Sequence, residues 1–138
     1  MIQPFHLAIK IHNLDEARTF YGELLGFEEG RSNNSWIDWN FFGHQLVTHL
    51  DNSLIIDNII NLVDNKNIPV PHFGVVLEWK EWHEFAENLK KKQIKFIVEP
   101  YIRFRGLIGE QATMFFLDCS GNALEFKSFQ DESQLFAK

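Results

Sequence analysis

The chain has 138 residues, the size of one ordinary domain, and 45% of them are hydrophobic, which is enough to build a buried core. The net charge of −6 argues against a nucleic-acid-binding surface, and no apolar run approaches the length that crosses a membrane. Cys119 is the single cysteine, so an intramolecular disulfide is excluded, and the chain begins without the pattern of a signal peptide. We therefore expect a cytoplasmic protein with no nucleic-acid or membrane partner.

The first half opens with a strand over residues 5–11, in which apolar residues alternate with a polar face that carries His6. A helix is predicted next, with Asn13 or Asp15 as its N-cap, and Gly26 is expected to end it. Turn residues and short apolar runs then predict three strands, over residues 27–30, 35–42 and 45–50.

Residues 51–71 are rich in Asn, Asp and Pro and are predicted to form a connecting loop. Their apolar residues predict a short helical or packed segment that covers one end of the sheet. The second half repeats the plan of the first: a strand over 72–79, an amphipathic helix over 80–92, and strands over 95–99, 112–117 and 123–129, with a polar loop over 100–111.

Each half is therefore βαβββ. We predict an α+β fold in which two tandem βαβββ modules form a curved mixed sheet around a concave metal site. One domain is expected over residues 1–138, with module one at about 4–50, a connector at 51–70, module two at about 71–129 and a C-terminal tail at 130–138.

Two histidines and one glutamate are the candidate metal ligands. His6 and His72 open the two halves, and Glu125 lies on the last predicted strand. Any one of them alone is more simply a polar strand residue, but two imidazoles and a carboxylate on rigid strands suit a catalytic divalent metal with open positions. Ala8 and Gly74, two positions after each histidine, leave room beside such an ion.

Other side chains are candidates for catalysis or substrate binding. His49 is a possible fourth ligand or acid/base group, although an ordinary polar residue at a strand end explains it equally well. Tyr101, Arg103 and Arg105 are candidates to meet an anionic or phenolic substrate from the loop over 100–111, with Tyr101 as a catalytic group, although a plain surface loop explains any one of them more simply. Lys127 shares a strand face with Glu125 and is a candidate to neutralise substrate charge.

The single cysteine and the other three histidines are expected to have no catalytic or metal-binding role. Cys119 lies in a predicted turn with no base beside it in the sequence, so we expect it to be structural. His44 follows Gly43 in a turn and is also expected to be structural. His12 and His83 are expected to be solvated.

The chain resembles the vicinal oxygen chelate superfamily, which contains glyoxalase I, extradiol ring-cleavage dioxygenases, fosfomycin-resistance transferases and bleomycin-resistance binding proteins. The resemblance covers nearly the whole chain. It rests on the opening strand with His6, on LDEARTFY with LLGF at 14–27, on PHFGV at 71–75 and on the ending FLDCSGNALEF at 116–126.

This resemblance implies a divalent metal held by His6, His72 and Glu125. Glyoxalase I-like members add a carboxylate on the fourth strand, and this chain has none there, so it is more similar to small single-domain extradiol-type dioxygenases that act on a catecholic substrate. Fe(II) is then the expected metal, with Mn, Ni or Zn as alternatives, and a homodimer is expected. Two other functions stay open: a glyoxalase-type lyase or isomerase, and a metal-free small-molecule binding protein of the bleomycin-resistance kind.

Overall fold

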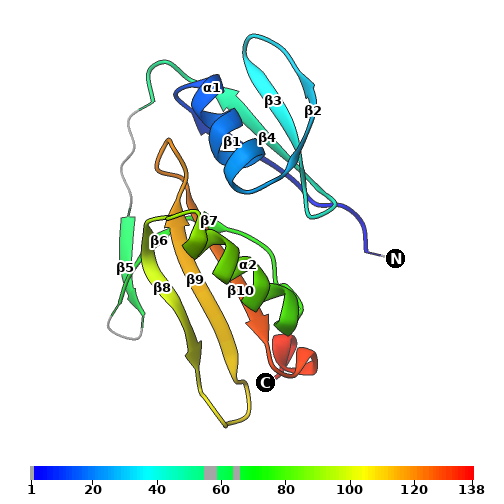
Figure 1. Ribbon diagram of the computed structural model, residues 1–138, viewed down its shortest axis with the longest axis vertical. Coiled ribbons are helices and arrows are strands. Elements are labelled where there is room, and N and C mark those ends of the chain that lie inside the picture. The colour runs from blue at the N-terminus through cyan, green and yellow to red at the C-terminus, as the bar shows by residue number, and fades with distance from the viewer. Residues whose placement is uncertain (1, 55–58, 64–65) are drawn as a thin grey trace. The chain divides into compact units, whose positions relative to one another are not determined.

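The computed structural model of the chain describes residues 2–54, 59–63 and 66–138, and Figure 1 shows its helices and strands. The chain forms two compact units. The first contains module one together with the turn Asp118–Asn122, and the second contains module two up to Leu117 and the segment Ala123–Lys138. Each unit carries its own four-stranded mixed sheet, so the predicted α+β fold of two βαβββ modules is confirmed.

The first unit has a sheet in the order β1-β4-β3-β2, with β1 parallel to β4 and the other pairs antiparallel. Its elements are β1 (His6–Ile11), α1 (Leu14–Ala17), a π-helical segment η1 (Arg18–Leu24), β2 (Glu28–Ser32), β3 (Trp36–Phe41) and β4 (His44–Leu50).

The helix of the first unit begins where the sequence predicts it. Asn13 is the N-cap, and its side-chain oxygen accepts a hydrogen bond from the backbone N–H of Glu16 at 3.0 Å. Gly26 follows the helix with a φ of 79°, a backbone conformation that favours glycine. The one difference is that the helix widens from α to π geometry at Arg18.

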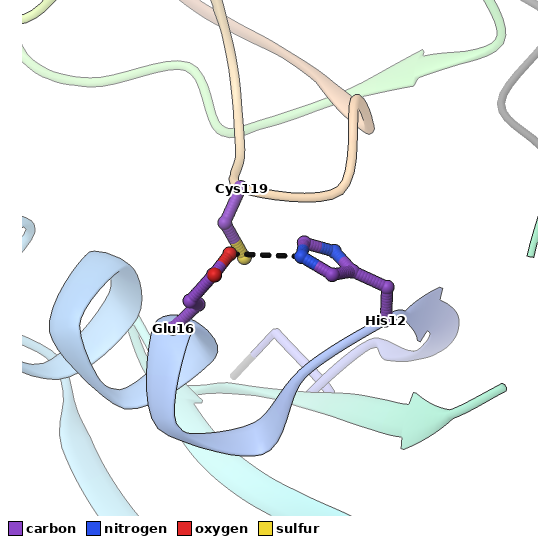
Figure 2. Close-up of side chains that lie close together, drawn as sticks. All are labelled: His12, Glu16 and Cys119. Atoms are coloured by element: carbon purple, nitrogen blue, oxygen red, sulfur yellow. Dashed lines mark ion pairs between the residues drawn. The ribbon is translucent and has the colours of Figure 1, made fainter. Parts of the chain in front are cut away.

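The turn Asp118–Asn122 lies beside the start of α1, where Cys119 comes close to His12 and Glu16 (Figure 2). The buried Tyr21 hydroxyl donates a hydrogen bond to Asp118 Oδ2 at 2.7 Å. Burial, followed by the charge of Asp118, raises the pKa of Tyr21 well above its usual value. The first unit is thus completed by a turn from the second module.

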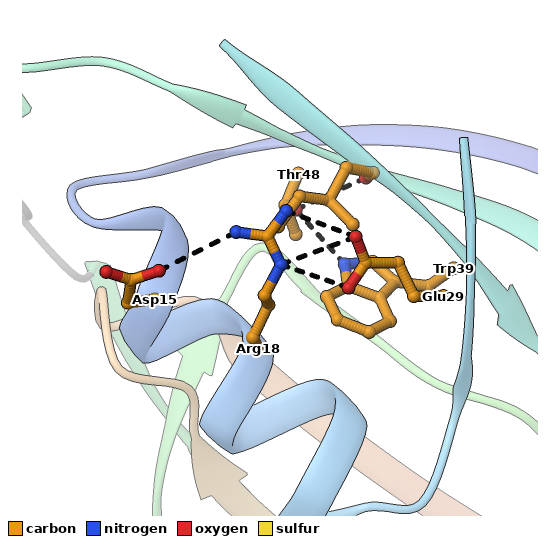
Figure 3. A network of polar contacts seen from close by, with 6 residues as sticks. Asp15, Arg18, Glu29, Trp39 and Thr48 are labelled. Atoms are coloured by element: carbon orange, nitrogen blue, oxygen red, sulfur yellow. Dashed lines mark hydrogen bonds and ion pairs between the residues drawn. The ribbon is translucent and has the colours of Figure 1, made fainter. Parts of the chain in front are cut away.

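A second polar network ties the helix of the first unit to β2 (Figure 3). The guanidinium of Arg18 donates to both carboxylate oxygens of Glu29, with Nε–Oε2 at 3.0 Å, and lies 3.6 Å from Asp15. The hydrogen bond from Arg18 lowers the pKa of Glu29. Beneath this network the indole of Trp39 donates to Thr48 Oγ1 at 3.1 Å.

The second unit has a sheet in the order β7-β10-β9-β8 and a separate two-stranded sheet of β5 and β6. Its elements are β5 (Ile59–Val63), β6 (Lys66–Val70), β7 (His72–Phe73), α2 (Trp79–Lys91), β8 (Phe96–Arg103), β9 (Gln111–Leu117), β10 (Ala123–Phe129) and a 3-10 helix η2 (Glu132–Phe136). None of the helices in the described part of the chain is long and apolar enough to span a membrane.

Helix α2 lies along one face of the sheet of the second unit (Figure 1). Its predicted apolar stripe is confirmed, because Trp82, Ala86 and Leu89 are buried. The indole of Trp82 also donates to the backbone oxygen of Phe126 at 2.8 Å. The opposite face of this sheet carries His72 and Glu125 and is not covered by α2.

Three predicted segments differ from the structure, and one of them, the loop over 100–111, gives up its first residues to β8, which continues to Arg103. The connector was expected to contain a loop and a helical or packed segment, but its described part forms the antiparallel pair β5–β6; residues 55–58 and 64–65 of the connector lie outside the described residues. The strand predicted over 72–79 is also too long. Regular pairing ends at Phe73, single contacts with β10 continue to Leu77, and Trp79 begins α2.

Candidate metal centre

His72 and Glu125 meet on the open face of the second unit. β7 runs parallel to β10 with His72 opposite Ala123, which brings the imidazole next to the glutamate two residues further along β10. His72 Nε2 lies 3.0 Å from Glu125 Oε2, and the two side chains are 28% and 14% exposed. The structure therefore brings together two of the three predicted ligands.

The other polar atoms of this pair are already engaged. His72 Nδ1 lies 2.8 Å from the carbonyl oxygen of Pro69, and because a carbonyl only accepts, Nδ1 carries the proton and donates it. The hydroxyl of Thr113 donates to Glu125 Oε1 at 2.7 Å. The edge of the His72 ring packs against Phe115, with ring centroids 5.0 Å apart. These contacts fix the orientation of both side chains.

This arrangement calls for a cation between His72 Nε2 and Glu125 Oε2. With the proton on Nδ1, Nε2 of a neutral imidazole presents a lone pair to a carboxylate oxygen, and two lone pairs at 3.0 Å repel unless a proton or metal ion lies between them. Two donors bonded at about 2.1 Å to one ion and about 90° apart are separated by about 3.0 Å. The pair and its outer hydrogen bonds therefore fit a divalent metal.

A hollow of about 220 Å³ opens beside this pair and is lined by His72, Phe73, Gly74, Val75, Val76, Glu125 and Lys127. Gly74 was expected to be small in order to leave room for an ion, but the structure gives a different reason. A Cβ atom at Gly74 would lie 1.6 Å from the backbone oxygen of Glu125. Glycine is required because the two backbones approach so closely.

Lys127 joins the same cluster. It lies opposite Thr113 in the β9–β10 pair, and its Nζ is 3.9 Å from Glu125 Oε1. Its charge is therefore held at the rim of the hollow, where it neutralises part of the carboxylate and is available to an anionic ligand.

Tyr101 and Arg103 are not in a loop, as the sequence predicted, but on β8. They lie opposite Thr113 and Gln111 in the sheet register and so share the face of Glu125. Tyr101 packs against the buried cluster of Ile68, Val98 and Phe115. Arg103 places its guanidinium 4.9 Å from the centre of the Phe104 ring. The element assignment of these two residues was wrong, and their strand holds them more firmly than a loop would.

Arg105 does lie beyond the strand, in the exposed hairpin after β8. It lines a groove of about 410 Å³ beside α2, together with His83 and Lys90. Tyr101 lines the same groove, whereas Arg103 is not among its lining residues.

His6 lies on β1 of the first unit and has the same protonation pattern as His72. Its Nδ1 is 2.7 Å from Gln45 Oε1, while Gln45 Nε2 is 3.3 Å from Asp38 Oδ2. Because a carboxylate only accepts, the amide nitrogen faces Asp38 and the amide oxygen faces His6, so His6 Nδ1 is the donor. In both histidines the proton lies on Nδ1, so Nε2 is the nitrogen that can bind a metal.

The register of the first sheet explains why it lacks a carboxylate like Glu125. His6 pairs with Gln45 just as His72 pairs with Ala123, so Val47 takes the position of Glu125 and His49 takes the position of Lys127. His49 is exposed on β4, opposite Trp36 and Lys10.

Three groups at or near these histidines were not singled out as site residues from the sequence. Asp38 and Thr113 could have been found, because strand alternation puts them on the faces of His6 and Glu125. The Pro69 carbonyl could not, because no sequence pattern indicated that its strand pairs with β5 and leads directly into β7.

The exposure of His12 accords with the expectation that it is solvated, but the fold gives His12 and Cys119 neighbours that the sequence did not indicate. His12 is partly exposed, but it contacts Ser120 and Glu16, and Cys119 lies next to it across a large sequence separation. His44, by contrast, accepts a hydrogen bond from the backbone N–H of Phe5 at 2.8 Å, which accords with a structural role.

Residues 3–126 match the model of the Glyoxalase/Bleomycin resistance protein/Dioxygenase superfamily. A comparison with curated proteins finds no match. Among solved structures, the glyoxalase/bleomycin resistance protein/dioxygenase from Alicyclobacillus acidocaldarius is 34% identical, with a TM-score of 0.81 over 97% of this chain and 96% of that one.

Two more distant structures share the fold. The fosfomycin resistance protein FosX from Listeria monocytogenes is 16% identical, with a TM-score of 0.69 over 97% of this chain and 98% of that one. A glyoxalase/dioxygenase from Nostoc punctiforme is 15% identical, with a TM-score of 0.67 over 94% and 92%. The resemblance seen in the sequence is thus confirmed.

Proposed function

Because the chain belongs to the Glyoxalase/Bleomycin resistance protein/Dioxygenase superfamily, we propose that it is a metal-dependent enzyme whose ion is held by His6, His72 and Glu125. The observation that carries this proposal is the pair of His72 Nε2 and Glu125 Oε2, which face each other at 3.0 Å while their other polar atoms, Nδ1 and Oε1, are hydrogen-bonded to Pro69 and Thr113. His6 joins them in the proposal because its Nδ1 is likewise hydrogen-bonded to an oxygen, which leaves Nε2 as its metal-binding nitrogen.

The reaction that we propose first is extradiol-type cleavage of a small catecholic substrate by oxygen. Two histidines with one carboxylate and open positions are the preferred ligands of non-haem Fe(II) in oxygenases, and Val47 stands where a further carboxylate would otherwise lie. The bound ion would act as a Lewis acid toward two neighbouring substrate oxygens. Mn is the nearest alternative metal.

The surrounding side chains have proposed roles on this substrate. Lys127 lies next to Glu125 and would balance the charge of a catecholate, and Arg103 would add a second positive charge on the same sheet face. Tyr101 and His49 are the proposed proton donors or acceptors at the substrate oxygens. Arg105, in the exposed hairpin, would contact an outer part of the substrate.

A glyoxalase-type lyase or isomerase is the second candidate, and one observation favours it. Asp38 supplies a carboxylate on β3, on the same face as His6 and linked to it through Gln45, with its side chain 13% exposed. Such a group is suited to act as a base in proton abstraction beside a metal-bound substrate oxygen, with Ni or Zn as the metal.

Metal content tests the proposal first. Full-length protein loaded anaerobically with Fe(II), Mn(II), Ni(II) or Zn(II) is analysed beside the variants His72→Ala and Glu125→Gln, with His83→Ala as a matched control on the exposed side of α2. We expect each of the first two variants to lose about one equivalent of ion and the control to lose none. Unchanged metal content in folded His72→Ala would contradict the enzyme proposal and favour a metal-free binding protein.

The metal that binds decides which reaction to assay. If the protein retains Fe or Mn, oxygen uptake with catechols is the assay to run. If it retains Ni or Zn, isomerisation of hemithioacetals is assayed instead. In the second case Asp38→Asn should abolish turnover, whereas dioxygen chemistry should survive it.

We also propose that the protein is a homodimer. Large apolar side chains that lie on the surface of the chain support this proposal: Phe5 is 63% exposed, Leu107 68% and Ile108 89%. Sedimentation equilibrium should give twice the mass of the chain. Mixing and co-refolding His6→Ala with His72→Ala then distinguishes a site within one chain from a shared site, because only a shared site recovers metal in the mixture.

A further inference from the structure

A second group of metal-ligating side chains lies in the first unit, and none of its members is among the ligands discussed above. His12 lies between β1 and α1, Glu16 lies on α1, and Cys119 comes from the turn Asp118–Asn122 (Figure 2). One ligand atom from each lies within 4.8 Å of the others. His12 Nε2 and Glu16 Oε2 are 2.8 Å apart.

We propose that His12, Glu16 and Cys119 bind a thiophilic divalent cation such as Zn²⁺. An imidazole, a carboxylate and a thiolate are all established Zn²⁺ ligands, and three protein ligands leave one position for water. The side chains of His12 and Glu16 are 41% and 55% exposed, so both can adjust toward the sulfur. This proposal does not depend on the proposed function.

Ser120 supports the ligands in the way that outer residues support metal-bound histidine. Its Oγ lies 2.6 Å from His12 Nδ1 and accepts the backbone N–H of His12 at 2.9 Å. It also lies 3.7 Å from Cys119 Sγ. When Ser120 accepts from Nδ1 and donates its own hydrogen to the sulfur, it leaves His12 Nε2 free for a metal and favours the thiolate form of Cys119.

The thiol is not reactive without a cation. Burial, followed by the charge of Asp118, raises the pKa of Cys119 from 9.0 to about 11, so the group is protonated at neutral pH. A metal ion would displace this proton, because a coordinated thiol is deprotonated.

Cobalt spectroscopy tests this site, since Co²⁺ bound to a thiolate absorbs in the near ultraviolet and Co²⁺ bound only to nitrogen and oxygen does not. Reduced full-length protein is titrated anaerobically with Co²⁺ and then with competing Zn²⁺. We expect about one equivalent of the thiolate band, its displacement by Zn²⁺, its loss in Cys119→Ser and its weakening in Glu16→Gln. His83→Ala, an exposed histidine on α2, should keep the band in full.

The variant His72→Ala separates this proposal from the proposed function. It should keep the thiolate band while losing the other equivalent of ion; if it loses neither, the proposed function fails and this site stands. No thiolate band in the wild-type protein, or a band that persists in Cys119→Ser, would overturn the site and leave His12, Glu16 and Ser120 as a hydrogen-bonded cluster without a metal.

Discussion

At the level of single residues, the two histidines of the candidate centre share one feature: their protons are fixed on Nδ1 by a neighbouring oxygen. For His72 that oxygen belongs to the Pro69 carbonyl, and for His6 to the side chain of Gln45. A histidine held in this way presents the same nitrogen whether or not a metal is bound, so little reorganisation is needed on binding.

Thr113 should act as a positioning residue for Glu125, because its buried hydroxyl donates to Oε1 and leaves Oε2 facing His72. We expect Thr113→Val to weaken metal binding by about 10–100-fold while the fold is retained. Competition with a fluorescent chelator measures this affinity. Thr113→Ser keeps the hydroxyl and should restore binding; equal losses in both variants would show that packing, and not the hydrogen bond, is responsible.

Gly74 should be the glycine least tolerant of a side chain for purely steric reasons. A methyl group there would lie 1.6 Å from the Glu125 backbone oxygen, so β7 and β10 must move apart. We expect Gly74→Ala to lower the free energy of unfolding by about 1–3 kcal/mol or more. Chemical denaturation measures this change, and Gly30→Ala on β2, whose Cβ makes only ordinary contacts, is the control.

Tyr21 should contribute to stability through its buried hydrogen bond to the carboxylate of Asp118. We expect Tyr21→Phe to cost about 1.5–3 kcal/mol at neutral pH, because the bond involves a charged acceptor. A cost near zero would mean that the three other hydrogen bonds of Asp118, from Ser120 and Asn122, satisfy it fully.

The same residue gives this stability a pH dependence. The pKa of Tyr21 is raised in the folded state, so its contribution is complete below the unfolded value of 10.0 and is lost as the pH rises further. Cys119 acts in the same direction between pH 9.0 and about 11. The midpoint temperature of thermal unfolding of the wild-type protein should therefore fall steeply as the pH rises through this range. The fall should be less steep in Tyr21→Phe.

At the level of elements, the helix after β1, helix α2 and most strands could be predicted from the sequence, because the positions of apolar residues indicate which face is buried. The stripe of Trp82, Ala86 and Leu89 on α2 is the clearest case. The exceptions include the end of β8, which was assigned to a loop, and η2, which lies in the predicted tail. The spacing of apolar residues does not indicate at which residue the backbone pairing of a strand ends. Residues 72–79 alternate like a strand, yet pairing ends after Phe73, where Gly74 approaches β10 too closely for a side chain.

The pair β5–β6 was missed for a related reason. The run Ile59-Ile60-Asn61-Leu62-Val63 has no alternation, and Pro69 indicates a loop, although a proline is tolerated in a two-stranded pair where one edge needs no donor. For the candidate site, the ligand residues could be predicted, but the contact of His72 with the Pro69 carbonyl depends on this pair and could not be predicted.

Helix α2 can be stabilised at its start. Glu78 is the N-cap and makes no capping hydrogen bond through its side chain, although its extended backbone suits a short capping residue. We expect Glu78→Ser to stabilise the protein by about 0.5–1 kcal/mol, measured by chemical denaturation. Glu84→Ser, in the middle of the same helix, is the control and should give no gain.

At the level of the whole molecule, the two units do not follow the two modules. The turn Asp118–Asn122 leaves β9 and returns to β10, yet its contacts lie in the first unit, with Tyr21, His12 and the carbonyl of Lys10. The first unit is therefore incomplete without residues that are about 60 positions or more beyond module one in the sequence.

We accordingly expect both units to unfold together. Hydrogen exchange followed by mass spectrometry, at increasing denaturant, should show the buried amides of β4 and of β10 reaching the same opening free energy. Tyr21→Phe should lower both values equally. A lower midpoint for β4 alone would show that the first unit opens independently.

The place of this turn also bears on how modules of this kind can be recombined. A chimera that joins module one of one relative to module two of another would carry a foreign turn into the first unit, and would need an acidic residue at Asp118 and an amide at Asn122 to satisfy Tyr21 and the Lys10 carbonyl. A crossover in the connector interrupts neither module in the sequence, but it takes these contacting residues from different parents. If residues 118–122 are exchanged together with module one, the turn and the first unit come from the same parent and keep their contacts.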